Sequence, residues 1–284
     1  MALPVVELLF GFPVLDPTHN FFDAIYDGDF GTATATKLPL VTAYGSKVVF
    51  TGDFTVDGAG VVTGGTMTGF KVFAGRTKVE TGSGYDISAT ALIAAVDAWQ
   101  TTSSVPLEEL LLDIPTKYLG SELGDFIFDI EGAGSIFLGR QGDDELFANS
   151  GDITLKGGKG NDLLVAEEGL CWYSGGQGQD VFAFLDPTKP NKILDFNVED
   201  DRFRLDPVTF VGVGQGALDD SQFRIGKQAS TEDQIILYQR GKGNVWFDQD
   251  GSGAVYDPIK FAKIDKGLDL AAQNFFGDEP VILG

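Results

Sequence analysis

A nine-residue pattern that returns at an 18-residue interval constrains the fold of this chain more than any other feature. Its three copies are Gly139–Phe147, Gly157–Val165 and Gly175–Ala183. The second and third copies read G-G-x-G-x-D-x-U-x, in which U is a large apolar residue. A strict period of this kind is typical of a solenoid, in which each repeat packs against the next.

The residue types of each copy suit a calcium loop followed by a short strand. Ca²⁺ takes roughly six to eight oxygen ligands from carboxylates and backbone carbonyls. Glycine allows the positive φ angles that turn carbonyls inward, and the single Asp adds a charged ligand. The residues after the Asp can extend, with the middle one pointing into a core. Each nonapeptide is therefore predicted to form half a turn of a roll.

Two incomplete copies separate the complete ones and place the metal sites on one edge. Ala148–Lys156 and Ala166–Ser174 keep the glycine and the apolar residue, but carry Ile153 and Cys171 where the Asp is expected. If two nonapeptides form one turn, all complete copies share an edge. An ion between successive loops would meet two Asp side chains, so two strong Ca²⁺ sites are expected.

The candidate metal ligands come from these loops and from two further segments. The complete copies contribute Gly142, Asp144, Gly157, Gly158, Gly160, Asp162, Gly175, Gly176, Gly178 and Asp180. A degenerate copy at Gly120–Phe128 adds Asp125, although Leu123 stands where glycine is wanted. The D-x-D-G-S-G segment Asp248–Gly253 adds Asp248 and Asp250, but lacks the Glu of an EF-hand loop and also suits a plain Asp-Gly turn. Together these segments would add one to three ions.

The nonapeptides resemble the RTX, or haemolysin-type, calcium-binding repeats of secreted bacterial proteins. The resemblance implies a mainly β fold: a right-handed parallel β-roll with a flanking β-rich N-terminal module, one or two short helices and a C-terminal cap. It also implies export by bacterial type I secretion machinery and folding on extracellular Ca²⁺. The expected location is therefore extracellular, either secreted or associated with the cell surface.

The order of the expected elements predicts three parts. Residues 1–118 form a β-rich module with a helix near 88–100, residues 119–186 the calcium-binding roll, and residues 187–284 a cap with the secretion-signal region. Strands are expected at Lys47–Val56 and Val61–Phe73, and a second short helix from Ser104. A hairpin is expected from Gln234–Tyr238 and Gly243–Phe247.

Composition narrows the partners. The chain of 284 residues has 42 acidic and 20 basic side chains, a net charge of −22, and no basic stripe, which argues against nucleic acid. No apolar run reaches the ~18 residues of a transmembrane segment. The N-terminus does not read as a standard signal peptide. Cys171 is the single cysteine, so no internal disulfide is expected.

Motifs of the enzymes that carry such repeats do not occur. The single histidine, His19, cannot form H-E-x-x-H, and G-x-S-x-G is lacking. No catalytic residue is therefore assigned. The leading expectation is a non-enzymatic surface, adhesion or matrix protein that engages the cell surface or extracellular polysaccharide.

Two other functions stay open. One is a small Ca²⁺-dependent exoenzyme acting on polysaccharide, because carboxylates abound without any pair standing out. The other is Ca²⁺-triggered self-cleavage at one of four Asp-Pro bonds, which begin at Asp16, Asp186, Asp206 and Asp257.

Overall fold

The computed structural model describes residues 2–9, 25, 28–42, 46–101, 107, 110–111, 114–129, 134–148, 152–167 and 169–277. The chain forms two compact units, residues 1–138 and 139–284. The division into three parts expected from the sequence follows motifs rather than compactness, and it stays a prediction.

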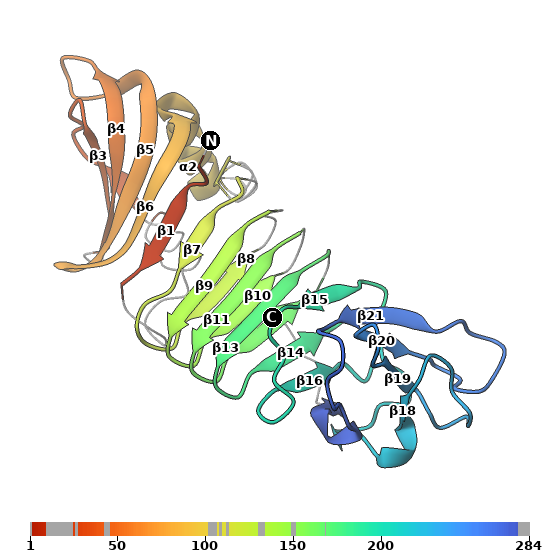
Figure 1. Ribbon diagram of the computed structural model, residues 1–284. Helices are drawn as coiled ribbons and strands as arrows, with labels where there is room; N and C mark the ends of the chain where they lie inside the picture. The colour runs from red at the N-terminus through yellow and green to blue at the C-terminus, as the bar shows by residue number, and fades with distance from the viewer. Residues whose placement is uncertain are drawn as a thin grey trace. The chain divides into compact units, whose positions relative to one another are not determined.

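The first unit is built on a sheet of mostly antiparallel strands (Figure 1). In spatial order, its antiparallel strands are β2 (Gly28–Phe30), β3 (Lys37–Thr42), β4 (Ser46–Val56), β5 (Val62–Ala74), β6 (Thr77–Ser88) and β1 (Val5–Leu8). Parallel strands β7 (Lys117–Leu119) and β9 (Ile136–Gln141) follow β1. Strand β8 (Phe126–Asp129) is not part of this sheet and belongs to a second sheet, which also contains the even-numbered strands β10 to β16. The β-rich N-terminal module is thereby confirmed.

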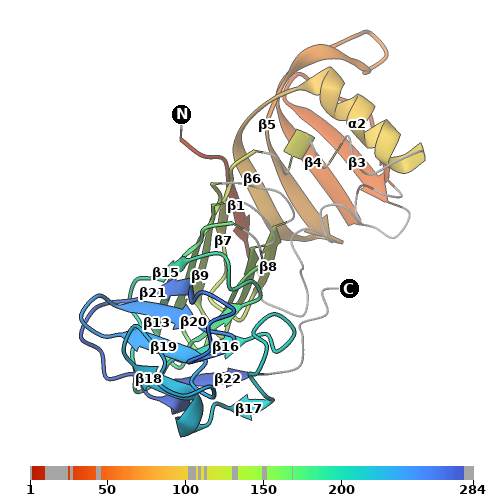
Figure 2. The same cartoon turned by 90° about the vertical axis from the view of Figure 1, so that its right-hand side faces the viewer.

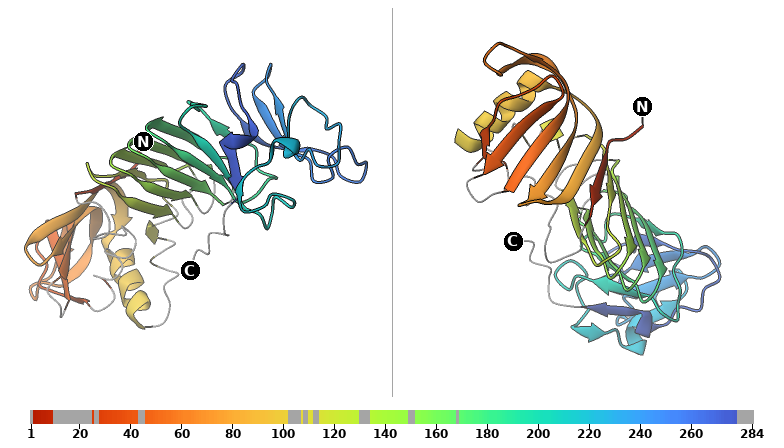
Figure 3. Two further views of the ribbon diagram at one scale, coloured as in Figure 1. Left: turned by 90° about the horizontal axis from the view of Figure 1, so that it is seen from below. Right: turned by 90° about the vertical axis from the view of Figure 1, so that its left-hand side faces the viewer.

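Helix α2 (Ala89–Thr101) follows β6 and lies across one face of this sheet (Figures 2 and 3). The Oγ of Ser88 accepts a hydrogen bond from the N–H of Ala91 at 3.4 Å, as expected for an N-cap. Leu92 and Val96 are fully buried on its inner side. The second helix, expected from Ser104, falls largely outside the described residues.

The second unit contains a parallel β-roll, and the described residues form about four solenoid turns. Each turn places one strand in each of two sheets (Figure 1). One sheet contains β11 (Thr154–Lys159), β13 (Trp172–Gln177), β15 (Asn191–Ile193) and β21 (Ile259–Lys263). The other contains β10 (Glu145–Ala148), β12 (Leu163–Ala166), β14 (Val181–Phe184), β16 (Arg202–Leu205) and β22 (Phe275–Gly277). The predicted β-roll is confirmed.

The core of the roll is a stack of the eighth-position apolar residues. Leu146 pairs with Leu164, Leu164 with Phe182, and Phe182 with Phe203 on successive strands. All four are completely buried. The stack continues to Phe275, whose ring centroid lies 4.6 Å from that of Phe203. Burial of this row explains why each nonapeptide keeps its apolar residue while other positions vary.

The chain between β16 and β21 adds a short hairpin segment to the roll. The predicted hairpin forms from β19 (Ile236–Gln239) and β20 (Asn244–Phe247), with β18 (Phe223–Ile225) beside β19. Strand β17 (Gly216–Ala217) pairs antiparallel with β22, and the 3₁₀ helices η1 (Asp220–Gln222) and η2 (Ala272–Asn274) precede β18 and β22. These additions cover edges that would otherwise expose unpaired backbone. In the described part of the chain, no helix has the length and apolar character needed to span a membrane.

Candidate metal centre

Three aspartates stack along one edge of the roll. Asp144, Asp162 and Asp180 come just before β10, β12 and β14, and each is at most 1% exposed. The backbone N–H of Asp144 donates to Oδ1 of Asp162 at 2.9 Å. The N–H of Asp162 donates in the same way to Oδ1 of Asp180 at 3.0 Å. One carboxylate oxygen of each later copy is thus held by the backbone of the copy before it.

The other carboxylate oxygen has no such partner in two of the copies. Oδ2 of Asp162 and Oδ2 of Asp180 are buried and accept no hydrogen bond. Each lies over the first glycine of its own copy. A Cβ added to Gly157 would be 2.0 Å from Oδ2 of Asp162, and one added to Gly175 would be 2.2 Å from Oδ2 of Asp180. A buried acceptor left unsatisfied costs about 1–3 kcal/mol, and more when charged, so these oxygens suit a cation.

Burial makes these carboxyl groups reluctant to ionise. It raises the pKa of Asp162 to about 7, the hydrogen bond from Asp144 opposes the shift, and the negative charge of Asp180 adds to it. Burial likewise raises the pKa of Asp180. A bound cation would remove this penalty by compensating the negative charge.

The glycines of the loops bring backbone carbonyls to the same edge. Gly158 and Gly160 both have φ +124°, a region that side-chain-bearing residues avoid. A Cβ on Gly158 would lie 2.3 Å from the carbonyl oxygen of Arg140, and one on Gly160 would lie 2.0 Å from that of Gly142. The arrangement recurs one copy later, with Gly176 over the oxygen of Gly158 and Gly178 over that of Gly160.

The two spaces between successive complete loops therefore offer hard oxygen donors. Each is bordered by two buried carboxylates and by backbone carbonyls, the donor types that Ca²⁺ prefers. Among the described residues, no three His, Cys, Asp or Glu side chains gather in one metal-binding group. Backbone oxygens would have to supply most of the ligands, and the glycines that expose them fit that requirement.

The stack of Asp144, Asp162 and Asp180, here called the ladder, has a fourth member that the 18-residue period did not predict. Oδ1 of Asp201 accepts the N–H of Asp180 at 3.1 Å, although the two residues are 21 apart. Its Oδ2 accepts the N–H of Asn197 at 2.8 Å, and burial raises its pKa to about 6. Both oxygens are satisfied, so Asp201 ends the stack rather than repeating it. The acidic turns of Lys192–Asp206 were the available sequence signal.

The opposite edge has neutral side chains at the positions that correspond to the stacked aspartates. Ile153 and Cys171 are buried where the other edge has Asp. The N–H of Cys171 donates to Oδ1 of Asn191 at 2.9 Å, which parallels the bond between Asp180 and Asp201 with an uncharged acceptor. The alternation of complete and incomplete copies thus separates a carboxylate edge from a neutral one.

Asp125 lies in the first unit and uses its carboxylate locally. The backbone N–H of Ser121 donates to Oδ2 of Asp125 at 2.5 Å, and the Ser121 hydroxyl lies 3.3 Å from Oδ1. These bonds brace the degenerate loop. They differ from the ladder, where the donor belongs to another copy.

The second acidic segment follows β20 in the cap. Asp248 is 3% exposed, and Oδ1 of Asp248 and Oδ1 of Asp250 are both buried without a hydrogen-bond partner. Burial raises the pKa of Asp248, and the nearby charge of Asp250 raises it further. Oδ2 of Asp250 accepts the N–H of Val255 at 2.9 Å, as in an Asp-stabilised turn. The turn accounts for Oδ2 of Asp250. Oδ1 of Asp248 and Oδ1 of Asp250 are left available to a cation.

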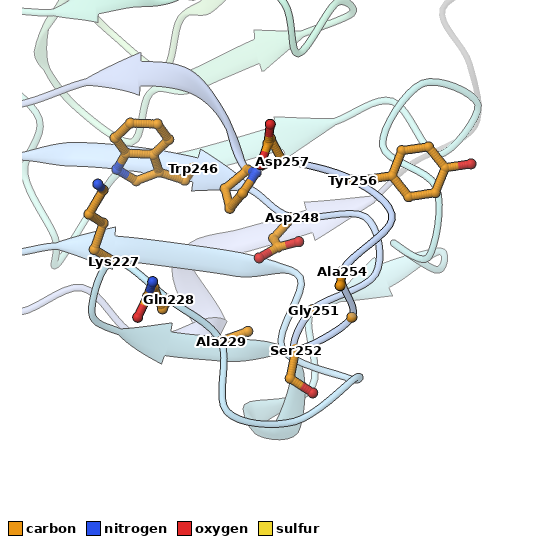
Figure 4. Close-up of a pocket in the computed structure, with 12 residues that line it drawn as sticks. Lys227, Gln228, Ala229, Trp246, Asp248, Gly251, Ser252, Ala254, Tyr256 and Asp257 are labelled. Atoms are coloured by element: carbon orange, nitrogen blue, oxygen red, sulfur yellow. The ribbon is translucent and has the colours of Figure 1, made fainter.

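This segment borders a hollow of about 620 Å³ (Figure 4). Asp248 and Asp257 line it together with Trp246, Tyr256 and Lys227. The Nε1–H of Trp246 is buried and has no hydrogen-bond acceptor. The hollow is therefore lined by aromatic side chains together with acidic and basic side chains.

The other candidate residues from the sequence either form turns or lie outside the described residues. His19 and the Asp16-Pro17 bond lie outside the described residues. Asp186 accepts the backbone N–H of Thr188 at 2.7 Å, and Asp206 accepts that of Val208 at 3.0 Å. These two Asp-Pro sites have the hydrogen bonds of ordinary turns.

No protein-family model and no curated protein matches the chain. Among solved structures, it is similar to the solution structure of the AlgE6R3 subunit from the Azotobacter vinelandii mannuronan C5-epimerase. The match has 20% sequence identity, covers 56% of this chain and 76% of that one, and has a TM-score of 0.26.

Proposed function

We propose that this chain is an RTX-type calcium-binding protein whose roll folds when Ca²⁺ enters the spaces between complete nonapeptides. Its carboxylate ligands would be Asp144, Asp162 and Asp180. Carbonyl oxygens of the glycine-rich loops, including those of Gly142 and Gly160, would complete the coordination. The observation that carries the proposal is the buried, unpartnered Oδ2 of Asp162 and of Asp180.

The chemistry of the edge favours Ca²⁺ over other metals. Zn²⁺ prefers thiolate and imidazole ligands, whereas Cys171 belongs to the opposite edge. Mg²⁺ demands near-ideal octahedral geometry and keeps several waters, which suits a carbonyl-lined loop poorly. Asp248 and Asp250 are proposed as an additional Ca²⁺ site, since each keeps a buried unpartnered oxygen.

The place of action follows from the affinity expected of such loops. Extracellular calcium modules bind with Kd values of roughly 10⁻⁴–10⁻³ M, so the roll would be only weakly stable at cytosolic calcium and would fold fully outside. The net charge of −22 supports this coupling, because self-repulsion opposes compaction until cations bind. Export by a type I system and a secreted or surface-associated location are part of the proposal.

The biological role that we propose is non-enzymatic. The roll would fold on calcium and display the N-terminal sheet at a cell surface or in an extracellular matrix. A polysaccharide-cleaving activity is the second candidate, because Asp248 and Asp257 line one hollow with Trp246 and Tyr256. A screen of the calcium-loaded protein for release of reducing sugar from polysaccharides separates the two.

The calcium claim is tested by far-UV circular dichroism and thermal melting. We expect millimolar Ca²⁺ to raise the β signal and the Tm, EGTA to reverse both, and equimolar Mg²⁺ to have little effect. Identical spectra and melting curves in Ca²⁺ and EGTA would refute the proposal.

A further inference from the structure

One face of the N-terminal sheet carries lysines from three adjacent strands. Lys37 is on β3, Lys47 on β4 and Lys71 on β5. The whole chain has a net charge of −22, yet residues 28–88 contain five acidic and five basic side chains. The sheet is therefore a locally neutral region within a strongly acidic protein. Its lysines share one face with acidic residues such as Asp29, which pairs with Val41, the partner of Lys47.

The strand register places these lysines on the same face. Lys47 pairs with Phe73, and Lys71 precedes Phe73 by two residues, so all three point the same way. Lys37 pairs with Thr51, which lies four residues along β4 from Lys47 and shares its face.

The intervening residues point to the other face. Leu38, Val48 and Val72 are nearly or completely buried there. Helix α2 lies across that face (Figure 3). The lysines are thus on the side of the sheet away from α2, and Lys37 and Lys71 are exposed.

The lysine face is hollowed rather than flat. Lys37, Lys47 and Lys71 line a hollow of about 370 Å³ together with Pro39 and Phe73. The Nζ of Lys47 lies 4.6 Å from the centroid of the Phe73 ring, a cation–π contact that fixes one ammonium group. Among the described residues, none of the three lysines forms a salt bridge.

We propose that this lysine face binds an acidic polysaccharide through its carboxylate or sulfate groups. Lysines on β3 and β5 are two strand spacings apart, about 10 Å, which the charged groups of a linear sugar polymer can span. Nucleic acid is disfavoured, because the ammonium group of Lys47 lies over the ring of Phe73, the aromatic side chain of the hollow on which a base would have to stack. The inference rests on the proposed surface or matrix role and names the partner for the N-terminal sheet.

The test measures binding of the full chain in millimolar Ca²⁺ to four probes: polygalacturonate, dextran sulfate, neutral dextran and duplex DNA. We expect binding to at least one acidic polysaccharide, none to dextran, and an affinity that falls as salt screens the charges. The Lys37→Gln/Lys47→Gln/Lys71→Gln variant should bind at least ~10-fold more weakly. The matched control is Lys156→Gln/Lys192→Gln/Lys266→Gln, which removes three exposed lysines of the second unit and should bind like the wild type.

Three results would overturn the inference: no binding to either acidic polysaccharide, equal weakening in both triple variants, or DNA binding as tight as the better polysaccharide. These three results do not decide the calcium proposal, which is tested by a separate variant. An Asp162→Asn/Asp180→Asn variant should respond less to Ca²⁺, yet keep the polysaccharide affinity of the lysine face. Polysaccharide binding can thus fail while the calcium response stays intact, and the reverse.

Discussion

The backbone N–H of Asp162 donates to Oδ1 of Asp180 at 3.0 Å, and this bond links the two sides of one candidate calcium space. It fixes the Asp180 carboxylate so that its Oδ2 lies over Gly175, buried and without a hydrogen bond. The same side chain therefore has one oxygen committed to the fold and one available to a cation. Predictions for the ladder follow from this division.

Asp162→Asn should separate metal binding from folding. The amide oxygen can still accept the N–H of Asp144, but the site loses one negative charge. We expect calcium affinity to fall by roughly tenfold or more, equivalent to about 1.4 kcal/mol per decade. In EGTA the variant should be at least as stable as the wild type, because a buried charge has been removed.

The control for this variant is Asp152→Asn on the neutral edge. It makes the same charge change at an exposed side chain that accepts the N–H of Leu170. Thermal melts with and without calcium check both variants. A lower Tm for Asp162→Asn in EGTA, or an equal loss of calcium response in the control, would contradict the assignment.

Gly160→Ala should prevent the roll from closing. Gly160 has φ +124°, and an added Cβ would lie 2.0 Å from the carbonyl oxygen of Gly142. We expect a loss of at least about 3 kcal/mol of stability in calcium, measured by urea unfolding. Gly241→Ala is the matched control, because its Cβ would meet nothing within 4 Å, and it should change stability by no more than about 0.5 kcal/mol. Similar effects for both would mean that the close stacking of loops is wrong.

Asp201→Ala should act on folding rather than on calcium. Both oxygens of Asp201 accept backbone N–H groups, and the substitution leaves the buried N–H of Asp180 and the partly buried N–H of Asn197 without these acceptors. Each is worth about 1–3 kcal/mol, so stability should fall in calcium and in EGTA alike. The number of ions bound, determined by titration calorimetry under conditions where the variant is folded, should equal that of the wild type. A missing ion would make Asp201 a metal ligand.

In EGTA, stability should decrease as pH rises from about 4 to about 7. Burial raises the pKa of Asp162 to about 7 and that of Asp201 to about 6, from 3.8. The folded chain then retains protons that the unfolded chain has released, so the free energy of unfolding falls with pH in this window. Melts at pH 4.5 and 7.5 should differ by roughly 3–10 °C.

The pH effect has an internal control and a calcium counterpart. Asp162→Asn should weaken the pH dependence in EGTA, whereas Asp152→Asn should leave it unchanged. Calcium competes with these protons, so its affinity should rise between pH 5 and 7.5. An unaltered pH profile in Asp162→Asn would show that this carboxyl does not set it.

The period of the nonapeptides predicted the roll because it combines two constraints. The eighth-position residues Leu146, Leu164 and Phe182 must stack in register, and the glycines must let carbonyls approach the next loop. Both depend on local spacing, which a sequence displays directly. The difference between the two edges follows from the same spacing, since Ile153 and Cys171 replace the Asp in every second nonapeptide.

Features that depend on contacts between distant segments were not predictable in this way. Asp201 joins the ladder although its spacing of 21 breaks the period, because the chain between β14 and β16 takes a longer path. The lysine face arises only when β3, β4 and β5 are placed in register. The buried oxygen of Asp248 became apparent from its packing in the cap, since an Asp-Gly sequence alone describes a turn equally well.

Calorimetric titration of the metal-free chain with Ca²⁺ tests the central claim most directly. We predict at least two ions per chain, one for each space between complete loops. The Asp162→Asn/Asp180→Asn variant should lose these ions, and Asp152→Asn should keep them. Absence of calcium binding to the wild type, or full binding to the double variant, would contradict the account.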